Sequence, residues 1–317
     1  MAARFAFTTA FGKARQRFLL ASAALLSACG GNDHPADPDA TQLTAAETGA
    51  PTANGNVATD GMTWLNFRRT QAGLPALQRD PRLDLAASRH STYQQLNDVV
   101  THDENSGKPG FFAAMAPERL RAADFPLQAT AFADGEVIAA TGAPDGFASV
   151  EGLLGAIYHR YVVLEPMFNA SGAGAAHREG SFYWLTMNLV GLKGSMGIAQ
   201  GSIAVWPLPA QKSVRTNFFS DQETPDPVPH ADEVGYPVSV HANLNAMLRV
   251  DRFTLSGPDG QPVEVRQLDA ATDRDTPSSA AAIIPLQPLR SGTTYSVSFT
   301  GHVDGQAVER RWQFTTR

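Results

Sequence analysis

The chain has 317 residues, of which 43% are hydrophobic and 18% are charged, and its formal net charge is −6. At roughly 150 residues per domain, this length corresponds to about two domains, and the hydrophobic fraction argues against a disordered chain. The acidic balance and the absence of a long Lys/Arg block argue against nucleic acid as a partner. The single cysteine, Cys29, excludes a disulfide framework within the chain.

Residues 1–28 have the composition of a secretory signal peptide. Basic residues precede an apolar run at 18–26, small residues follow it, and no acidic residue occurs in the segment. The run is about half as long as the ~20 residues that a membrane-spanning helix needs. Its removal would take away four of the 25 basic residues and none of the 31 acidic ones, so the mature chain would have a net charge of −10.

The end of this segment, Leu26-Ser27-Ala28-Cys29, resembles the lipobox of bacterial lipoproteins. The resemblance implies cleavage before Cys29, lipidation of its thiol and attachment of an exported protein to the cell envelope. Each buried acyl CH₂ contributes about 0.8 kcal/mol to such an anchor. Because Gly30 rather than Asp follows the cysteine, the resemblance implies the outer membrane in a cell with two membranes.

Residues 29–60 contain almost no large apolar side chain, so they cannot bury enough surface to fold alone. We interpret them as a flexible tether between the anchor and the folded part of the chain.

Residues 61–194 show a mixture of helical and strand patterns. Asp80-Pro81 is typical of a helix start, with Asp as the N-cap and Pro in the first turn. Apolar residues then recur at spacings of three and four as far as residue 100, which predicts an amphipathic helix. We also predict helices over Thr63–Ala72 and Phe147–Leu164 and a central strand over Ser181–Val190.

Residues 200–317 change to a period of two and show no helical pattern. The runs 294–301 and 307–315 flank Asp304-Gly305, which predicts a β-hairpin with a two-residue turn. Several short strands separated by turn residues indicate a β-sandwich. The expected fold class is therefore α+β, with a mixed domain followed by an all-β domain.

Histidines and acids of the middle region are the candidates for chemistry. His90 lies on the apolar face of the second predicted helix, Glu136 follows a turn glycine, and His159 lies near the end of the third predicted helix. Neutral imidazoles and a carboxylate suit zinc, yet the chain has no HExxH motif and no two histidines at i, i+4. A buried structural histidine explains a single inward-facing His equally well.

Several other motifs are absent or ambiguous. There is no GxSxG elbow, no GxxxxGK[ST] loop and no GxGxxG turn, so neither an α/β-hydrolase triad nor nucleotide binding is supported. The run 101–104, which includes His102, is either a solvated loop or a wall of a site. Ser91, beside His90, is typical of a backbone-bonded helix serine rather than a nucleophile.

Taken in order, a set of short matches resembles the CAP superfamily (cysteine-rich secretory, antigen 5, pathogenesis-related) in its bacterial SCP-like branch. The matching segments are Leu65–Arg69, Gly73–Leu77, Asp80, Leu83, Ala86–Ser91, Thr101-His102, Glu118-Arg119, Gly135-Glu136, His159-Arg160 and Gly172–Gly174. The last ~80 residues resemble an immunoglobulin-like or fibronectin-like module, mainly through 295–297 and 312–315.

The CAP resemblance implies an α-β-α sandwich over 61–194, with a cleft lined by two histidines and two acids. Carried onto this sequence, the implied cleft residues are His90, Glu136 and His159, with Glu151 as the candidate for the second acid. The resemblance implies binding of a lipid or a cell-wall fragment, and we predict a non-catalytic envelope protein.

Two rival hypotheses stay open at this point. In the first, His90 and His159 hold Zn²⁺ and Glu136 acts as general base in a metal-dependent hydrolase acting on peptides or peptidoglycan. In the second, the β-rich region at 200–317 docks a partner and the middle domain is a passive scaffold.

Overall fold

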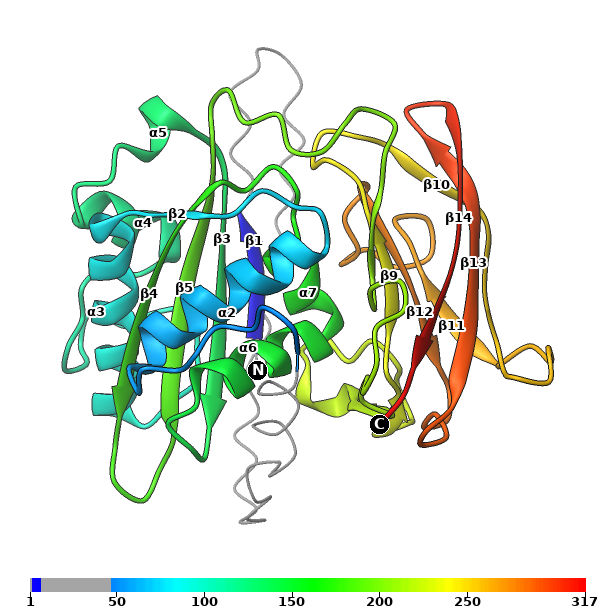
Figure 1. Ribbon diagram of the computed structural model, residues 1–317. Coiled ribbons are helices and arrows are strands. Elements are labelled where there is room, and N and C mark those ends of the chain that lie inside the picture. The colour runs from blue at the N-terminus through cyan, green and yellow to red at the C-terminus, as the bar shows by residue number, and fades with distance from the viewer. Residues whose placement is uncertain (1, 7–46) are drawn as a thin grey trace. The chain divides into compact units, whose positions relative to one another are not determined.

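The computed structural model describes residues 2–6 and 47–317, which divide into two compact units (Figure 1). Unit 1 holds the described residues up to Arg68 together with Ala76–Leu154 and Phe168–Ser195, and unit 2 holds Arg69–Pro75, Gly155–Met167 and Met196–Arg317. Cys29, most of the predicted signal peptide and most of the predicted tether lie outside the described residues. The expected α+β class is confirmed.

Unit 1 is built on one five-stranded sheet with the order β1-β3-β5-β4-β2. The strands β3, β5 and β4 pair antiparallel, and the short β2 runs parallel to β4. The strands are β1 (Ala2–Ala6), β2 (Gln78–Arg79), β3 (Ala131–Thr141), β4 (Ala170–His177) and β5 (Tyr183–Leu192). The helices are α2 (Val57–Gln71), α3 (Pro81–Asn97), α4 (Ala116–Ala122), α5 (Leu127–Thr130) and α6 (Gly146–Gly155).

Helices cover both faces of this sheet. Side chains alternate between the faces of a strand, so neighbouring residues of β5 identify the two layers. Thr186 faces α3 and accepts a hydrogen bond from Ser91 (2.9 Å), whereas Leu185 lies against Gly61 of α2. The predicted α-β-α sandwich is confirmed, and Glu136 of β3, which pairs with Asn188, lies on the same face as α3.

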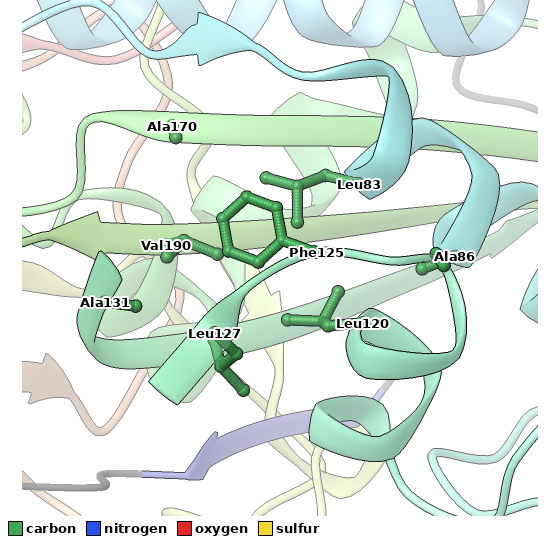
Figure 2. Close-up of a cluster of buried hydrophobic side chains, with 9 residues drawn as sticks. Leu83, Ala86, Leu120, Phe125, Leu127, Ala131, Ala170 and Val190 are labelled. Carbon is green, nitrogen blue, oxygen red and sulfur yellow. The ribbon is translucent and has the colours of Figure 1, made fainter. Parts of the chain in front are cut away.

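The predicted start of α3 is confirmed in detail. Asp80 is the N-cap, its side chain accepts from the backbone N–H of Arg82, and Pro81 occupies the first turn. A buried hydrophobic cluster then joins α3, α4 and α5 to the sheet (Figure 2). The cluster consists of Leu83, Ala86, Leu120, Ala123, Phe125, Leu127, Ala131, Ala170 and Val190.

The single helix predicted over Phe147–Leu164 is wrong. Two helices occupy this stretch, α6 and α7 (Ile157–Val163), and the residue between them, Ala156, has an extended backbone. Glycine has a low helix propensity, and Gly155 stands where α6 ends. The break falls near the boundary between the units, so most of α6 belongs to unit 1 and all of α7 belongs to unit 2.

Unit 2 contains α7 and the β-rich C-terminal region. Its sheets have the orders β10-β13-β14, β11-β12-β9-β6 and β7-β8. The two larger sheets are consistent with the predicted β-sandwich, and the only helical turn of 200–317 is the short 3₁₀ segment η1 (Ser220–Gln222). The strands are β6 (Ala204–Trp206), β7 (Asn217–Phe219), β8 (Glu233–Gly235), β9 (Val238–His241), β10 (Leu248–Ser256), β11 (Val265–Leu268), β12 (Ala280–Pro285), β13 (Thr294–Val303) and β14 (Gln306–Thr315).

The predicted hairpin between β13 and β14 is confirmed. The two strands pair from Thr294↔Thr315 to Val303↔Gln306, so the turn is Asp304-Gly305. Both turn residues have positive φ, 51° and 80°, as a two-residue type I′ turn requires.

Within residues 2–6 and 47–317, no helix combines the length and the apolar character that crossing a bilayer requires.

The contact between α3 and β4 depends on two glycines of β4. A Cβ atom added to Gly174 would lie 2.1 Å from the backbone nitrogen of Ser88, and one added to Gly172 would lie 2.2 Å from that of Asp84. The helix backbone therefore rests directly on the strand.

Gly174→Ala should accordingly push α3 away from the sheet and lower the free energy of unfolding by at least ~2 kcal/mol, as overpacking of a tight core does. Urea denaturation of the variant measures this loss. Gly142→Ala is the matched control, because nothing lies within 4 Å of its added Cβ. Equal stability of the two variants would contradict the close packing.

Candidate functional site

Glu136 of β3 is the centre of a buried charged group in unit 1. Its side chain is 1% exposed. Arg119 of α4 donates from one terminal nitrogen to both carboxylate oxygens at 2.8 Å, and Nδ1 of His102 lies 2.8 Å from Oε1. A carboxylate removed from water in this way needs charged or hydrogen-bonding partners, and the structure supplies both kinds.

Arg119 connects Glu136 to the segment that follows α3. The same terminal nitrogen donates to the carbonyl oxygen of His102 (2.9 Å), and the other donates to the carbonyls of Ala113 and Ala114 (3.4 Å each). Arg119 is itself fully buried. One guanidinium therefore positions the backbone of His102 while it binds the carboxylate that holds the ring of His102.

The electrostatics keep Glu136 ionised. Burial alone would raise its pKa, but Arg119, His90 and His102 together outweigh burial and hold the pKa well below its usual range. Asp134, two residues earlier on β3, shows the opposite balance. Burial raises the pKa of Asp134 to about 7, the nearby Arg121 opposes this, and the charge of Glu136 adds to it.

His90 is buried beside this group, but both of its ring nitrogens are used within the protein. Nδ1 lies 2.8 Å from Oε1 of Glu104, and Nε2 donates to the carbonyl oxygen of Thr101 (2.7 Å). The other oxygen of Glu104 accepts from the backbone N–H of Phe112 (2.7 Å). His90 lies 3.9 Å from Glu136, so the structure brings these two predicted residues together, with His90 holding the 101–112 segment in place.

Glu151, the predicted second acid, belongs to a different cluster of unit 1. Its Oε1 accepts from the indole nitrogen of Trp64 (2.7 Å) and from Nε of Arg68 (2.6 Å). Arg68 is also paired with Glu47 (2.6 Å). These contacts connect α6 to α2 and, through Arg68, to Glu47, the first residue of the described range 47–317.

His159, the predicted second histidine, lies on α7 in unit 2, and its acidic partner is Glu223. Nδ1 of His159 is 2.8 Å from Oε1 of Glu223, and both side chains are 1% exposed. The carboxylate also accepts the backbone N–H groups of Ile157, Tyr158 and His159 at 2.9, 2.9 and 3.2 Å. The structure therefore pairs His159 with an acid that the sequence analysis did not select.

Ser91 is held as a structural residue. Its hydroxyl is fully buried and lies 2.9 Å from both the carbonyl oxygen of Gly174 and the hydroxyl of Thr186. These contacts attach α3 to β4 and β5, which agrees with the interpretation of Ser91 as a hydrogen-bonded helix serine. A hydroxyl enclosed by two strands and paired with no base is not arranged as a nucleophile.

The described side chains do not fit the zinc centre considered from the sequence. No group of three or more His, Cys, Asp or Glu within the described ranges is arranged to hold a metal ion. His90 would have to give up a hydrogen bond to offer a ligand nitrogen, since both of its ring nitrogens are engaged. We therefore derive no step through a metal.

The histidines, Arg119 and Glu136 all lie within one recognisable segment of the chain. Residues 64–189 match the family model described as CAP, the cysteine-rich secretory protein family. The chain contains a CAP domain. The resemblance stated from the sequence is confirmed, and the match includes His102, Glu136 and His159 but ends before Glu223.

Solved structures of other proteins also resemble part of this chain. An extracellular protein with an SCP domain from Bacillus anthracis str. Ames is 24% identical, with a TM-score of 0.36, over 44% of this chain and 44% of that chain. An outer surface protein of Borrelia burgdorferi is 14% identical, with a TM-score of 0.35, over 42% of this chain and 90% of that chain. The similarity thus spans less than half of the Bacillus protein, and no curated protein matches the chain.

Four contributors to these sites were not predicted from the sequence, namely His102, Glu104, Arg119 and Glu223. The run Thr101-His102-Asp103-Glu104 held the available signal, a histidine among acids directly after a predicted helix, but this pattern also fits a solvated loop. For Glu223 no local signal existed, because its partner is 64 residues away in the chain.

Glu136→Gln should destabilise unit 1 by about 3 kcal/mol at pH 7, because the buried guanidinium of Arg119 loses the carboxylate that it binds at 2.8 Å, while Glu104 lies 3.8 Å from its Nε. A carboxyl with a depressed pKa stabilises the fold above its unfolded pKa of about 4.3 and loses this contribution as the pH falls. The difference between variant and wild type should therefore shrink in acid.

Chemical denaturation at pH 7 and at pH 3 measures both effects. Glu179→Gln is the control, because Glu179 is exposed and its replacement should change stability by less than about 0.5 kcal/mol. A Glu136→Gln variant as stable as this control would show that the ion pair contributes nothing.

Proposed function

We propose that this protein is exported, anchored in the cell envelope by a lipidated Cys29, and uses its CAP domain to bind a lipid or a cell-wall fragment without transforming it. The observation that carries the proposal is the state of Glu136. Its carboxylate is buried, ionised and shared between Arg119 and His102. A carboxylate in this state orients the side chains that donate to it, here Arg119 and His102.

Binding is favoured over hydrolysis by the proton affinity of this group. A general base works best when its pKa is near the operating pH. The pKa of Glu136 is held well below its usual range, so this carboxylate is a poor acceptor for a proton from water. The hydroxyl of Ser91, next to His90 in the chain, is hydrogen-bonded to the sheet.

The surface beside the charged group supports an amphipathic ligand. Phe111 and Met115, which bracket the carbonyls held by Arg119, are 39% and 45% exposed. Large exposed apolar side chains near an interaction site mark contacts with apolar partners. A molecule with both polar and apolar parts matches this combination.

Cys29→Ser should move the protein from the membrane fraction to the soluble fraction of its native cell, because the substitution removes the thiol that carries the acyl chains. Fractionation and intact-mass measurement of the extracted protein check this, with the wild-type mass expected to exceed that of the unmodified chain. An unmodified wild-type chain starting upstream of Cys29 would contradict the anchor.

His102→Ala should weaken binding at least tenfold, because it removes the ring held by Glu136 at the centre of the site. Binding is measured with vesicles of phosphatidylethanolamine and phosphatidylglycerol and, separately, with purified peptidoglycan fragments. His177→Ala is the control, since His177 is an exposed histidine of the same unit.

The two probes distinguish the two ligand classes, and native mass spectrometry of the extracted protein identifies a co-purified lipid or glycan. Equal binding by His102→Ala and the control would overturn the assignment of the site. Turnover of peptidoglycan or peptides by the wild-type protein, abolished in His102→Ala, would overturn the non-catalytic function in favour of hydrolysis.

A further inference from the structure

Glu223 reaches α7 from outside the CAP match. It follows η1 in the segment between β7 and β8, whereas the match ends at residue 189. Its carboxylate is buried and makes four contacts with the first turn of α7, three with backbone N–H groups and one with Nδ1 of His159.

The first turn of α7 needs this carboxylate. The N–H groups that open a helix have no partner within the helix, and the N-cap residue here, Ala156, has no side-chain oxygen to accept from them. A negative charge at a helix N-terminus is also favourable to the helix dipole. Glu223 therefore does, from 64–66 residues away, what a Ser or Asp N-cap does locally.

The same carboxylate determines the state of the His159 ring. A carboxylate can only accept a hydrogen bond, so Nδ1 of His159 carries a proton, and in the neutral ring Nε2 is then the nitrogen with the lone pair. His102 is held in the same way, with its Nδ1 2.8 Å from Oε1 of Glu136. The two histidines thus share one arrangement, in which a buried carboxylate fixes the tautomer and the ring.

Other side chains of α7 hold the helix in place through contacts of their own. Every residue from Ile157 to Val163 is buried. Arg160 donates to the carbonyl of Pro237 (2.7 Å), and the hydroxyl of Tyr158 donates to Asp273 (3.3 Å). These contacts anchor the helix through other side chains and do not touch the ring nitrogen Nδ1 of His159.

We propose that Glu223 is the positioning residue of His159, so that the C-terminal region supplies the second acid of the CAP domain in place of Glu151. Glu151 is already bonded to Trp64 and Arg68. The proposal rests on the proposed function only in treating His159 as a binding residue. The β-rich region thereby supplies the carboxylate that positions the second histidine of the CAP domain.

The test uses the full mature chain and the Glu223→Leu variant, with histidine side chains observed by two-bond ¹H–¹⁵N NMR at pH 8. His159 is assigned by its absence in His159→Gln. In the wild type, His159 should be the Nδ1–H tautomer. Glu223→Leu removes both acceptor oxygens, so nothing holds the proton on Nδ1 and the Nε2–H tautomer should appear.

Glu165→Leu is the matched control. Glu165 is a buried glutamate of the same unit that accepts two backbone N–H groups, those of Met167 and Leu244, at 2.9 and 3.0 Å. Its replacement should lower stability without changing the His159 tautomer. If Glu223→Leu does not fold, the wild-type spectrum alone decides, because an Nε2–H tautomer of His159 there would overturn the proposal.

Binding of the same vesicles and peptidoglycan fragments separates this inference from the proposed function. A tautomer change with at least tenfold weaker binding supports both. A tautomer change with unchanged binding supports the positioning role and counts against His159 as a binding residue. An unchanged tautomer in a folded Glu223→Leu variant overturns the positioning role, whatever the binding result.

Discussion

The cost of burying a carboxylate organises the CAP domain. Glu136 lies on the face of the central sheet that α3 covers, where an unpaired negative charge would be strongly destabilising. Arg119 compensates for this charge, and its guanidinium also donates hydrogen bonds to the carbonyl oxygens of His102, Ala113 and Ala114. The loop between α3 and α4 is therefore placed by the same interaction that keeps Glu136 ionised. The interaction connects β3 to α4, and the hydrophobic cluster of Figure 2 packs α3, α4 and α5 onto the strands beside it.

Glu223 is a second buried carboxylate whose charge is compensated by hydrogen-bond donors. There the compensating donors are three backbone N–H groups and the ring of His159 rather than a guanidinium. Both solutions place a histidine ring against a buried carboxylate through Nδ1, and both fix its tautomer. Both carboxylates are thereby occupied in holding a histidine, which is why we favour a binding role over a general base at either position.

Part of the fold and little of the sites could be predicted from the sequence. The N-cap at Asp80, the hairpin turn at Asp304-Gly305 and the central strand expected over Ser181–Val190 are local patterns, and the structure confirms them, with β5 at Tyr183–Leu192. The helix predicted over 147–164 failed because α6 ends at Gly155 and the new start at Ile157 is stabilised by Glu223, which no window around residue 156 contains. His90 was selected because it lies on an apolar helix face, and that position also explains why both of its nitrogens are used inside the protein.

What the sequence by itself determined was the CAP domain, the class of the fold and the residue types of the sites. These depend on short-range order: helical and strand periods, turn chemistry and an ordered series of motifs. Only the tertiary structure decided which acid serves which histidine. It paired Glu136 with His102 and Arg119, and Glu223 with His159. The physical reason is that a buried charge takes whichever donors the packing of distant segments brings within hydrogen-bonding distance, and separation along the chain carries no information about that choice.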